Sequence, residues 1–214
     1  EPTAAYWMDR HPVTNAEYLE FVRKNPDWRK SRARKVFVDR SYLAHFQTDL
    51  KLAKGIRGRA PVTHVSYFAA QAYCGSLGMH LPTTAQWEYA AAASETKADA
   101  SRDLEFLNRI LEWYAEPKSN EPLPEIKRRK PNFYGLYDLH GLTWEWVEDF
   151  NSNLVTGESR EDGSLNRNLF CGSGAMSGGD KENYAAFMRF AFRSSLKGKS
   201  TAWNLGFRCA KEGA

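Results

Sequence analysis

The spacing of apolar and polar positions predicts a set of short amphipathic helices, most of them opened by a capping residue. In the first, Thr14 can cap the helix and Glu17 stands three residues later, which is the spacing of a capping box. We expect this helix to end at about Lys24, because Pro26 cannot continue it. Just before it, residues 6–9 are typical of the end of a strand.

Two further helices follow the same rule. One begins after Ser66, carries apolar residues at helical spacing and ends near Gly78. The next begins after Thr83, which forms a second capping box with Gln86 and places Trp87 on the inward side. A fourth amphipathic helix, closed by Pro117, is indicated by Leu104, Leu107, Leu111 and Tyr114.

The chain after Trp146 lacks this regularity. It consists mostly of short apolar runs interrupted by glycines and polar turns, so we expect irregular structure there. Such structure needs a stabilising feature other than regular helices and strands. There is no internal repeat and no linker-like segment, and residues 1–214 are therefore expected to form a single domain.

Composition narrows the function classes. The chain has 214 residues, 14% of them aromatic and 26% charged, which indicates a globular protein with room for a core. A net charge of +4 is too small to imply nucleic-acid binding, and no apolar run is long enough to span a membrane. The basic runs 28–35 and 127–130 could bind an anion, but solvated surface is the commoner meaning of such runs.

Residues 134–146 form the most unusual segment, Y-G-L-Y-D-L-H-G-L-T-W-E-W. Asp138 and Glu145 stand seven residues apart, with Gly141 and Thr143 between them as sources of backbone carbonyls. Calcium needs several such oxygens on a sharply turning chain, and Gly141 supplies the turn. The alternative is an aromatic core turn whose two acids merely face water.

Several blocks of this sequence, in this order, resemble the formylglycine-generating enzyme (sulfatase-modifying factor) family. The resemblance covers nearly the whole chain and implies a mixed α/β fold of the C-type-lectin-like kind, with much irregular structure. It also implies that most of a first strand precedes Glu1. The blocks are P-V-T-N-A-E-Y (12–18), P-V-T-H-V-S-Y (61–67), L-P-T-T-A-Q-W-E-Y-A (81–90), the aromatic segment 134–146 and N-L-G-F-R-C (204–209).

The resemblance also implies two stabilising features. It places a calcium site on the side chains of Asp138 and Glu145 and on carbonyls of the turn between them, and the family has Asn at the first of these positions. It pairs Cys74 with Cys209 in a disulfide, which leaves Cys171 as the one free thiol of three cysteines. We therefore expect bound calcium and one disulfide.

The cysteines that carry the family's catalysis are not found at the corresponding positions of this chain. Its enzymes oxidise a substrate cysteine with copper held by two cysteines five residues apart, because Cu(I) prefers soft thiolates. Those positions fall on Asp180 and Ala185, so this chemistry is not expected. The five histidines are scattered singly along the chain and do not show the spacing of related iron enzymes, although folding can still gather two or three of them.

A narrower resemblance concerns residues 149–160, 170–175 and 184–196. These stretches are similar to a bacterial subgroup called NirV-like, whose members are found alongside copper nitrite reductases and copper-delivering proteins. It implies a bacterial protein in an oxidising compartment, periplasmic or secreted, with an accessory role.

Three functions remain open. The first is a non-catalytic, calcium-stabilised accessory domain that binds a peptide or protein partner in the former substrate cleft. The second is a metal-dependent oxidoreductase with a rebuilt site, and the third is a structural or ligand-display role of the lectin-like kind. The first is favoured, and the residues expected near the cleft are Cys171, Met176, Asp180, Tyr184, Arg189 and Arg193.

Overall fold

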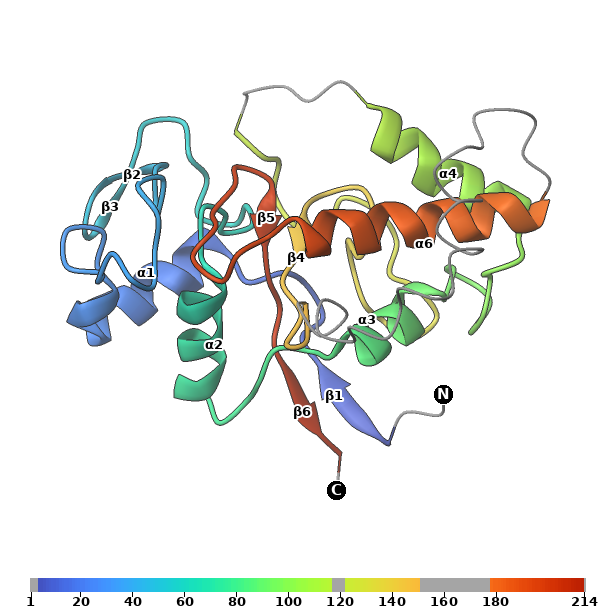
Figure 1. The fold of residues 1–214 in the computed structure, drawn as a ribbon, viewed down its shortest axis with the longest axis horizontal. Helices are drawn as coiled ribbons and strands as arrows, with labels where there is room; N and C mark the ends of the chain where they lie inside the picture. Colours follow the sequence, from blue (N-terminus) through green and yellow to red (C-terminus); the bar gives the residue numbers. More distant parts are fainter. Residues whose placement is uncertain (1–3, 117–121, 151–177, 214) are drawn as a thin grey trace, which may run out of the picture.

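A computed structural model describes residues 4–116, 122–150 and 178–213, with residues 178–183 described through their backbone alone (Figure 1). Helices and three small two-stranded sheets alternate with long irregular connections, so the fold is mixed α/β as expected. No helix in these ranges is both long and apolar enough to cross a membrane.

The sheets join distant parts of the chain. Strand β1 (Tyr6–Met8) pairs antiparallel with β6 (Ala210–Glu212), and the two lie side by side near the chain ends in Figure 1. Strand β4 (Trp144–Glu145) pairs in parallel with β5 (Leu205–Gly206). The third sheet is a local hairpin of β2 (Phe46–Thr48) and β3 (Lys51–Leu52). Two of the three sheets thus bind the C-terminal residues to earlier segments.

The capped helices form where the sequence predicts them. Helix α1 (Asn15–Lys24) is opened by the Thr14 capping box and is followed by the short 3-10 helix η1 (Pro26–Trp28). Helix α2 (Tyr67–Ser76) and helix α3 (Thr84–Ala91) begin after their predicted caps, and α3 has the complete capping box. These helix boundaries are confirmed to within about two residues.

Two longer helices cross the other half of the molecule. Helix α4 (Leu104–Ala115) matches the predicted amphipathic helix and packs on helix α6 (Gly178–Ser194) (Figure 1). The expectation of irregular structure after Trp146 is wrong for α6. Its buried or half-buried residues Ala185, Arg189 and Arg193 recur every four positions, which is the period of one helix face.

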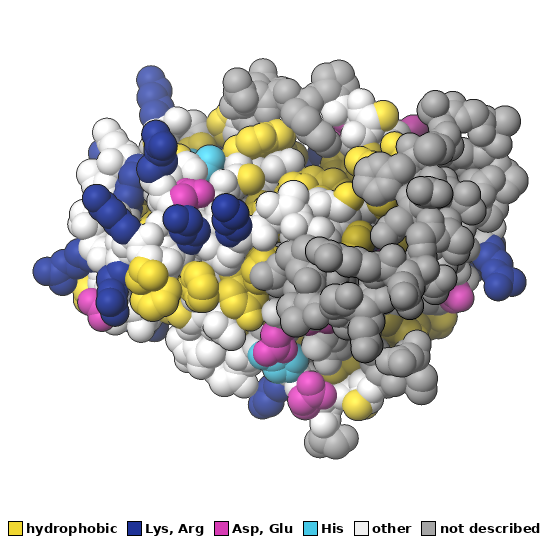
Figure 2. Space-filling model, in the orientation of Figure 1, with side chains coloured by type: hydrophobic (Ala, Val, Ile, Leu, Met, Phe, Trp, Pro, Cys, Tyr) yellow, Lys and Arg dark blue, Asp and Glu magenta, His cyan; other side chains and the backbone are white. Residues whose placement is uncertain are grey.

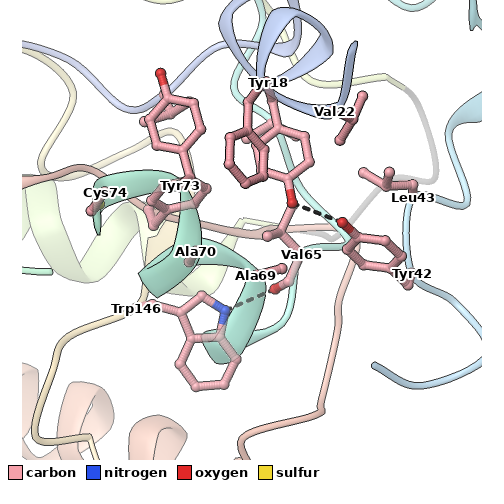
Figure 3. Packing of buried hydrophobic residues seen from close by; sticks show 14 of the residues in the cluster. Tyr18, Val22, Tyr42, Leu43, Val65, Ala69, Ala70, Tyr73, Cys74 and Trp146 are labelled. Carbon is pink, nitrogen blue, oxygen red and sulfur yellow. Dashed lines mark hydrogen bonds between the residues drawn. The ribbon is translucent and has the colours of Figure 1, made fainter. Parts of the chain in front are cut away.

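The main core lies between α1, α2 and residues of the irregular segments, among them Val65 and Trp146 (Figure 3). Tyr18 and Tyr42 meet there through their hydroxyl groups at 2.8 Å, and the indole of Trp146 donates to the carbonyl of Val65 at 2.8 Å. These three buried side chains therefore have hydrogen-bond partners in the aromatic core, as burial requires. Close packing extends to the backbone, because a side chain at Gly206 would lie 2.7 Å from the carbonyl oxygen of Val62.

A disulfide between Cys74 and Cys209, implied by the resemblance, is present in the structure. It links the end of α2 to the residue before β6, across 135 residues of sequence, and both cysteines are fully buried. The bond thus holds the C-terminal strand region to the helical core.

Replacing both cysteines, Cys74→Ala with Cys209→Ala, should destabilise the protein. The chain-entropy model predicts a loss of about 4–5 kcal/mol for a loop of this length. Urea unfolding followed by tryptophan fluorescence measures this, with Cys171→Ala as the matched control that removes the third sulfur. An unchanged unfolding midpoint in the double variant would contradict the assigned structural role.

Candidate functional site

The centre of the predicted calcium segment is a buried ion pair. Both side chains of Glu145 and Arg208 are fully buried, and two guanidinium nitrogens lie 2.8 Å from the two carboxylate oxygens. The indole of Trp87 also donates to Glu145 at 2.8 Å. Arg208 donates to two backbone carbonyls as well, those of Asp9 and Tyr137. The pair is therefore bidentate and surrounded by hydrogen bonds, the condition under which buried charges are tolerated.

Asp138 occupies a strained turn beside this pair. Its φ is +58°, in the left-handed region that few residues other than glycine adopt, and Gly141 turns the chain with a φ of +90°. The carboxylate of Asp138 accepts hydrogen bonds from the backbone amides of Lys127 and Arg128. Burial raises the pKa of Asp138, and the nearby charge of Glu145 raises it further, although these amide hydrogen bonds and Arg208 act in the opposite direction.

The residues of this segment fit calcium by donor type. Asp138 and Glu145 supply carboxylates, the oxygen donors that calcium prefers, and Gly141 turns the chain between them with a positive φ. A guanidinium nitrogen of Arg128 lies 3.5 Å from the carbonyl oxygen of Gly141, so a positive group already contacts one expected ligand. Thr143 directs its hydroxyl away, towards the carbonyl of Asn204 at 2.7 Å, and would contribute its carbonyl alone.

A second charged cluster joins α3 to α6. Glu88 of α3 accepts hydrogen bonds from Arg189 and from Arg193, whose nearest nitrogens lie 2.5 Å and 2.8 Å away. Arg189 also donates to the hydroxyl of Tyr114 on α4 at 3.1 Å, and both guanidinium groups lie over the ring of Trp87. Glu88 thus neutralises the charges of Arg189 and Arg193 within the fold, and Arg189 lines the cavity described next. The expected partner cleft at these residues stays a prediction.

A partly open cavity of about 230 Å³ is lined in part by this cluster. Ala185 of α6 lies in its wall with Glu88, Arg189 and His140. The ring of His140 contacts the carbonyl of Ala91 at 2.9 Å, and burial lowers the pKa of His140 to about 4, so the ring is neutral. The resemblance places one catalytic thiolate at position 185, and Ala185 offers only a methyl group there.

The other predicted cleft residues are less informative. Tyr184 is partly exposed, at 38%, on α6. Cys171 and Met176 lie outside the described residues, and the side chain of Asp180 does as well, although its backbone belongs to α6.

Aromatic rings fill the space between α4 and α6. The ring of Trp144 stacks on Phe192 with centroids 4.6 Å apart and on Tyr114 with centroids 5.1 Å apart. Trp113 completes the group at 5.2 Å from Trp144. These contacts hold α6 against the segment 134–146, since Trp144 directly precedes Glu145.

The basic run 28–35 lies at the surface, as the sequence favours. Figure 2 shows Lys and Arg side chains gathered over the end of the molecule that holds α1, β2 and β3. Two of the run's members bind backbone groups: Arg29 donates to the carbonyl of Val22, and Lys30 donates to that of Phe46. Part of this charge therefore stabilises the fold.

Comparison with known proteins decides the family. The model of the sulfatase-modifying factor enzyme 1-like domain matches residues 2–213. The chain belongs to the formylglycine-generating enzyme family. It is 31% identical to the formylglycine-generating enzyme of Mus musculus over 73% of its length, and 32% identical to the inactive C-alpha-formylglycine-generating enzyme 2 of Bos taurus over 73%. It spans 45% and 52% of these two relatives, about half of their length.

A solved structure supports the fold alone. PvdO from Pseudomonas aeruginosa superposes with a TM-score of 0.51 over 97% of this chain and 80% of the PvdO chain, at 15% identity. The mixed, weakly regular architecture described above is thus shared with a distant member of the same fold.

Sequence reasoning missed the role of Glu88. The signal was present in the four-residue spacing of Arg189 and Arg193, which predicts two cations on one helix face, but their partner lies about a hundred residues earlier. The spacing of the histidines in the sequence also did not indicate which of them lie together. The fold brings His45 and His64 together, with ring centroids 5.7 Å apart.

The Glu88 cluster should make stability depend on pH. Burial acts to raise the pKa of Glu88, but the charges and hydrogen bonds of Arg189 and Arg193 outweigh burial, so the pKa lies below its ordinary value of 4.5. Because the pKa of Glu88 is lower in the folded state than in the unfolded state, the ionised carboxylate stabilises the fold above pH 4.5. This stabilisation is lost as the pH falls through the pKa of the folded state. Glu88→Gln should therefore cost about 2 kcal/mol near neutral pH, and the deficit should shrink on acidification.

Urea unfolding between pH 7 and pH 3 measures this difference. Glu95→Gln is the control, because Glu95 pairs with Arg109 in a more exposed position and should cost at most about 1 kcal/mol. A deficit for Glu88→Gln that stays constant down to pH 3 would show that the carboxylate charge is not what stabilises α6.

Proposed function

We propose that this chain is a non-oxidising accessory domain of the formylglycine-generating enzyme family, which binds a peptide or protein partner. The observation that carries the proposal is the place of Asp180 and Ala185 within the continuous helix α6. Copper in the family is held by a thiolate at each of these positions, and carboxylate and methyl side chains do not replace soft sulfur ligands. The residues present therefore do not fit the family's copper site.

The helix itself also opposes such a site. Positions five residues apart in an α-helix are separated by about 7.5 Å along the axis and about 140° around it. Two side chains so placed point to different sides and cannot share one metal ion. The backbone at this site supports a structural role for α6, whose inward face binds Glu88 and packs on Trp144.

One relative has a name that agrees with this proposal. The Bos taurus protein that is 32% identical is called an inactive C-alpha-formylglycine-generating enzyme 2. Loss of the oxidase with retention of the scaffold is therefore known within the family. The resemblance to the NirV-like subgroup suggests a partner among proteins of bacterial nitrite reduction or copper delivery, and the Cys74–Cys209 disulfide favours a periplasmic or secreted location.

The outer side of α6 offers the partner a surface. Tyr184 and Phe190 of this helix are 38% and 46% exposed. Large aromatic side chains contribute most to protein interfaces when a partner covers them, which makes these two residues the expected anchors.

The test uses a cysteine-containing sulfatase peptide incubated with the protein, Cu(I) and oxygen. We expect no conversion of the cysteine to an aldehyde by mass spectrometry, even in the variant Asp180→Cys with Ala185→Cys, because the helix keeps the two thiols apart. Aldehyde formation by the natural chain would refute the proposal, and copper bound by both new thiols would refute the helical argument.

Partner binding is measured separately, with lysine-directed crosslinking in a periplasmic extract followed by identification of the captured proteins. Tyr184→Ala with Phe190→Ala should abolish capture of a specific partner. Trp7→Ala, which removes an aromatic side chain that is 71% exposed on β1, should not. Equal capture by both variants would place the partner elsewhere on the molecule.

We also propose that calcium stabilises this domain through Asp138 and Glu145, with the carbonyls of Gly141 and Thr143. Bound there, the ion would supply positive charge to a carboxylate whose pKa burial raises. Glu145 can keep its contacts with Arg208, because a carboxylate oxygen accepts more than one hydrogen bond or ligand. Arg128 would have to leave the carbonyl of Gly141.

Addition of calcium to chelator-treated protein should raise the melting temperature by several degrees. Asp138→Ala should abolish this rise, while Asp138→Asn, which keeps one ligand oxygen, should retain part of it. Arg128→Gln should strengthen calcium binding, because it removes the competing cation. Identical melting curves with calcium and with chelator would exclude the site.

A further inference from the structure

The structure contains a second cavity, of about 420 Å³, on the side of the molecule away from α6's contacts with α3. Its size lies within the range of pockets that hold small organic molecules. Apolar side chains and a few polar groups share the wall, which includes His45, His64, Thr63, Pro61, Leu123 and Trp203.

The hydrogen bonds around His45 define its tautomer. Asn15 donates its amide N–H to the carbonyl of Arg57 at 3.0 Å, which places its amide oxygen towards the ring of His45. That oxygen lies 2.8 Å from Nε2 of His45 and can only accept, so Nε2 carries the proton. Nδ1 of His45 therefore has a free lone pair, and it is buried without a hydrogen-bond partner in the described part of the chain.

His64 is in the same condition. Its ring is hydrogen-bonded to the backbone of Ser41, while its Nδ1 is buried and has no partner among the described residues. Its φ of +52° is unusual for a side chain of this size, so the fold holds the residue in a costly conformation. The rings of His45 and His64 face each other at an interplanar angle of 29°. Two stacked rings thus line the cavity, and Nδ1 of each has no donor among the described residues.

The electrostatics favour a neutral or anionic occupant. Burial lowers the pKa of His45 to about 3, and burial also lowers the pKa of His64 although the charge of Asp39 opposes this, so both rings are uncharged near pH 7. The charge of Lys30 acts on both rings, and the exposed residue Arg57 lines the cavity. No cluster of three metal-binding side chains occurs among the described residues, and positive charge disfavours a metal ion held by two histidines.

We propose that this cavity binds a small planar organic anion, which donates an N–H or O–H to His45 or His64 and directs its negative group towards Arg57. The indole of Trp203 and the apolar wall accommodate the body of the molecule. The χ2 torsion of histidine is broad, and we expect a turn of the ring about it to present Nδ1 to the ligand. The donor of the ligand then satisfies a buried nitrogen that has no partner among the described residues.

The probe is 4-hydroxybenzoate, which has an O–H donor at one end and a carboxylate at the other. Imidazole nitrogen resonances in the ¹⁵N-labelled protein should first show the Nε2–H tautomer for His45. On addition of the probe, the Nδ1 resonance of His45 or His64 should move with a saturable dependence on concentration. The methyl ether 4-methoxybenzoate lacks the donor and should bind at least tenfold more weakly, and so should 4-hydroxybenzylamine, which reverses the charge.

Three variants locate the site. Ala60→Leu should block binding by filling the cavity, and the exposed substitution Arg57→Gln should weaken it about fivefold without affecting the fold. His80→Gln is the control, since His80 lies beside Glu148 and Glu212 and does not line the cavity. Equal binding of the hydroxyl and methoxy probes, unchanged binding to Ala60→Leu and Arg57→Gln, or no response to any probe at millimolar concentration would overturn the proposal.

Discussion

The buried pair of Glu145 and Arg208 is the interaction on which the rest of the structure depends. Neither side chain has any exposed surface, so each charge is tolerable only because the other is present. Trp87 joins α3 to the pair, and the carbonyl of Asp9 joins the residue after β1 to it. The sheets in the described part of the chain are short, and the ion pair adds to their backbone hydrogen bonds in holding these segments together.

This constraint also explains how the two candidate sites are related. Trp87 donates to Glu145 with its indole nitrogen while its ring lies beneath the guanidinium groups of Arg189 and Arg193. The adjacent residue Glu88 neutralises these same groups. Consecutive residues of α3 thus connect the segment 134–146 to α6.

Local signals in the sequence determine much of the fold and little of the site. Thr14 and Thr83 predict the starts of their helices, because a capping box is made by two residues that stand three positions apart in the sequence. Helix α6 has no such signal, since it begins at Gly178 and Gly179, and its stability comes from Glu88 and Trp144 far along the chain. The pairing of His45 with His64 is equally non-local. Family resemblance supplied the Cys74–Cys209 pair, which the count of three cysteines left undetermined.

Ala185 stands where the family resemblance places a thiolate, and in this chain it has a packing role. The residue is buried against Ala100, Phe106 and Ile110, so its small side chain serves the packing between α4 and α6. A thiolate there would place a charge in an apolar cluster, while the cations that could balance it are already bound to Glu88. The ion cluster therefore opposes a sulfur site here, and α6 would have to lose its helical contacts before two sulfur atoms at residues 180 and 185 could converge.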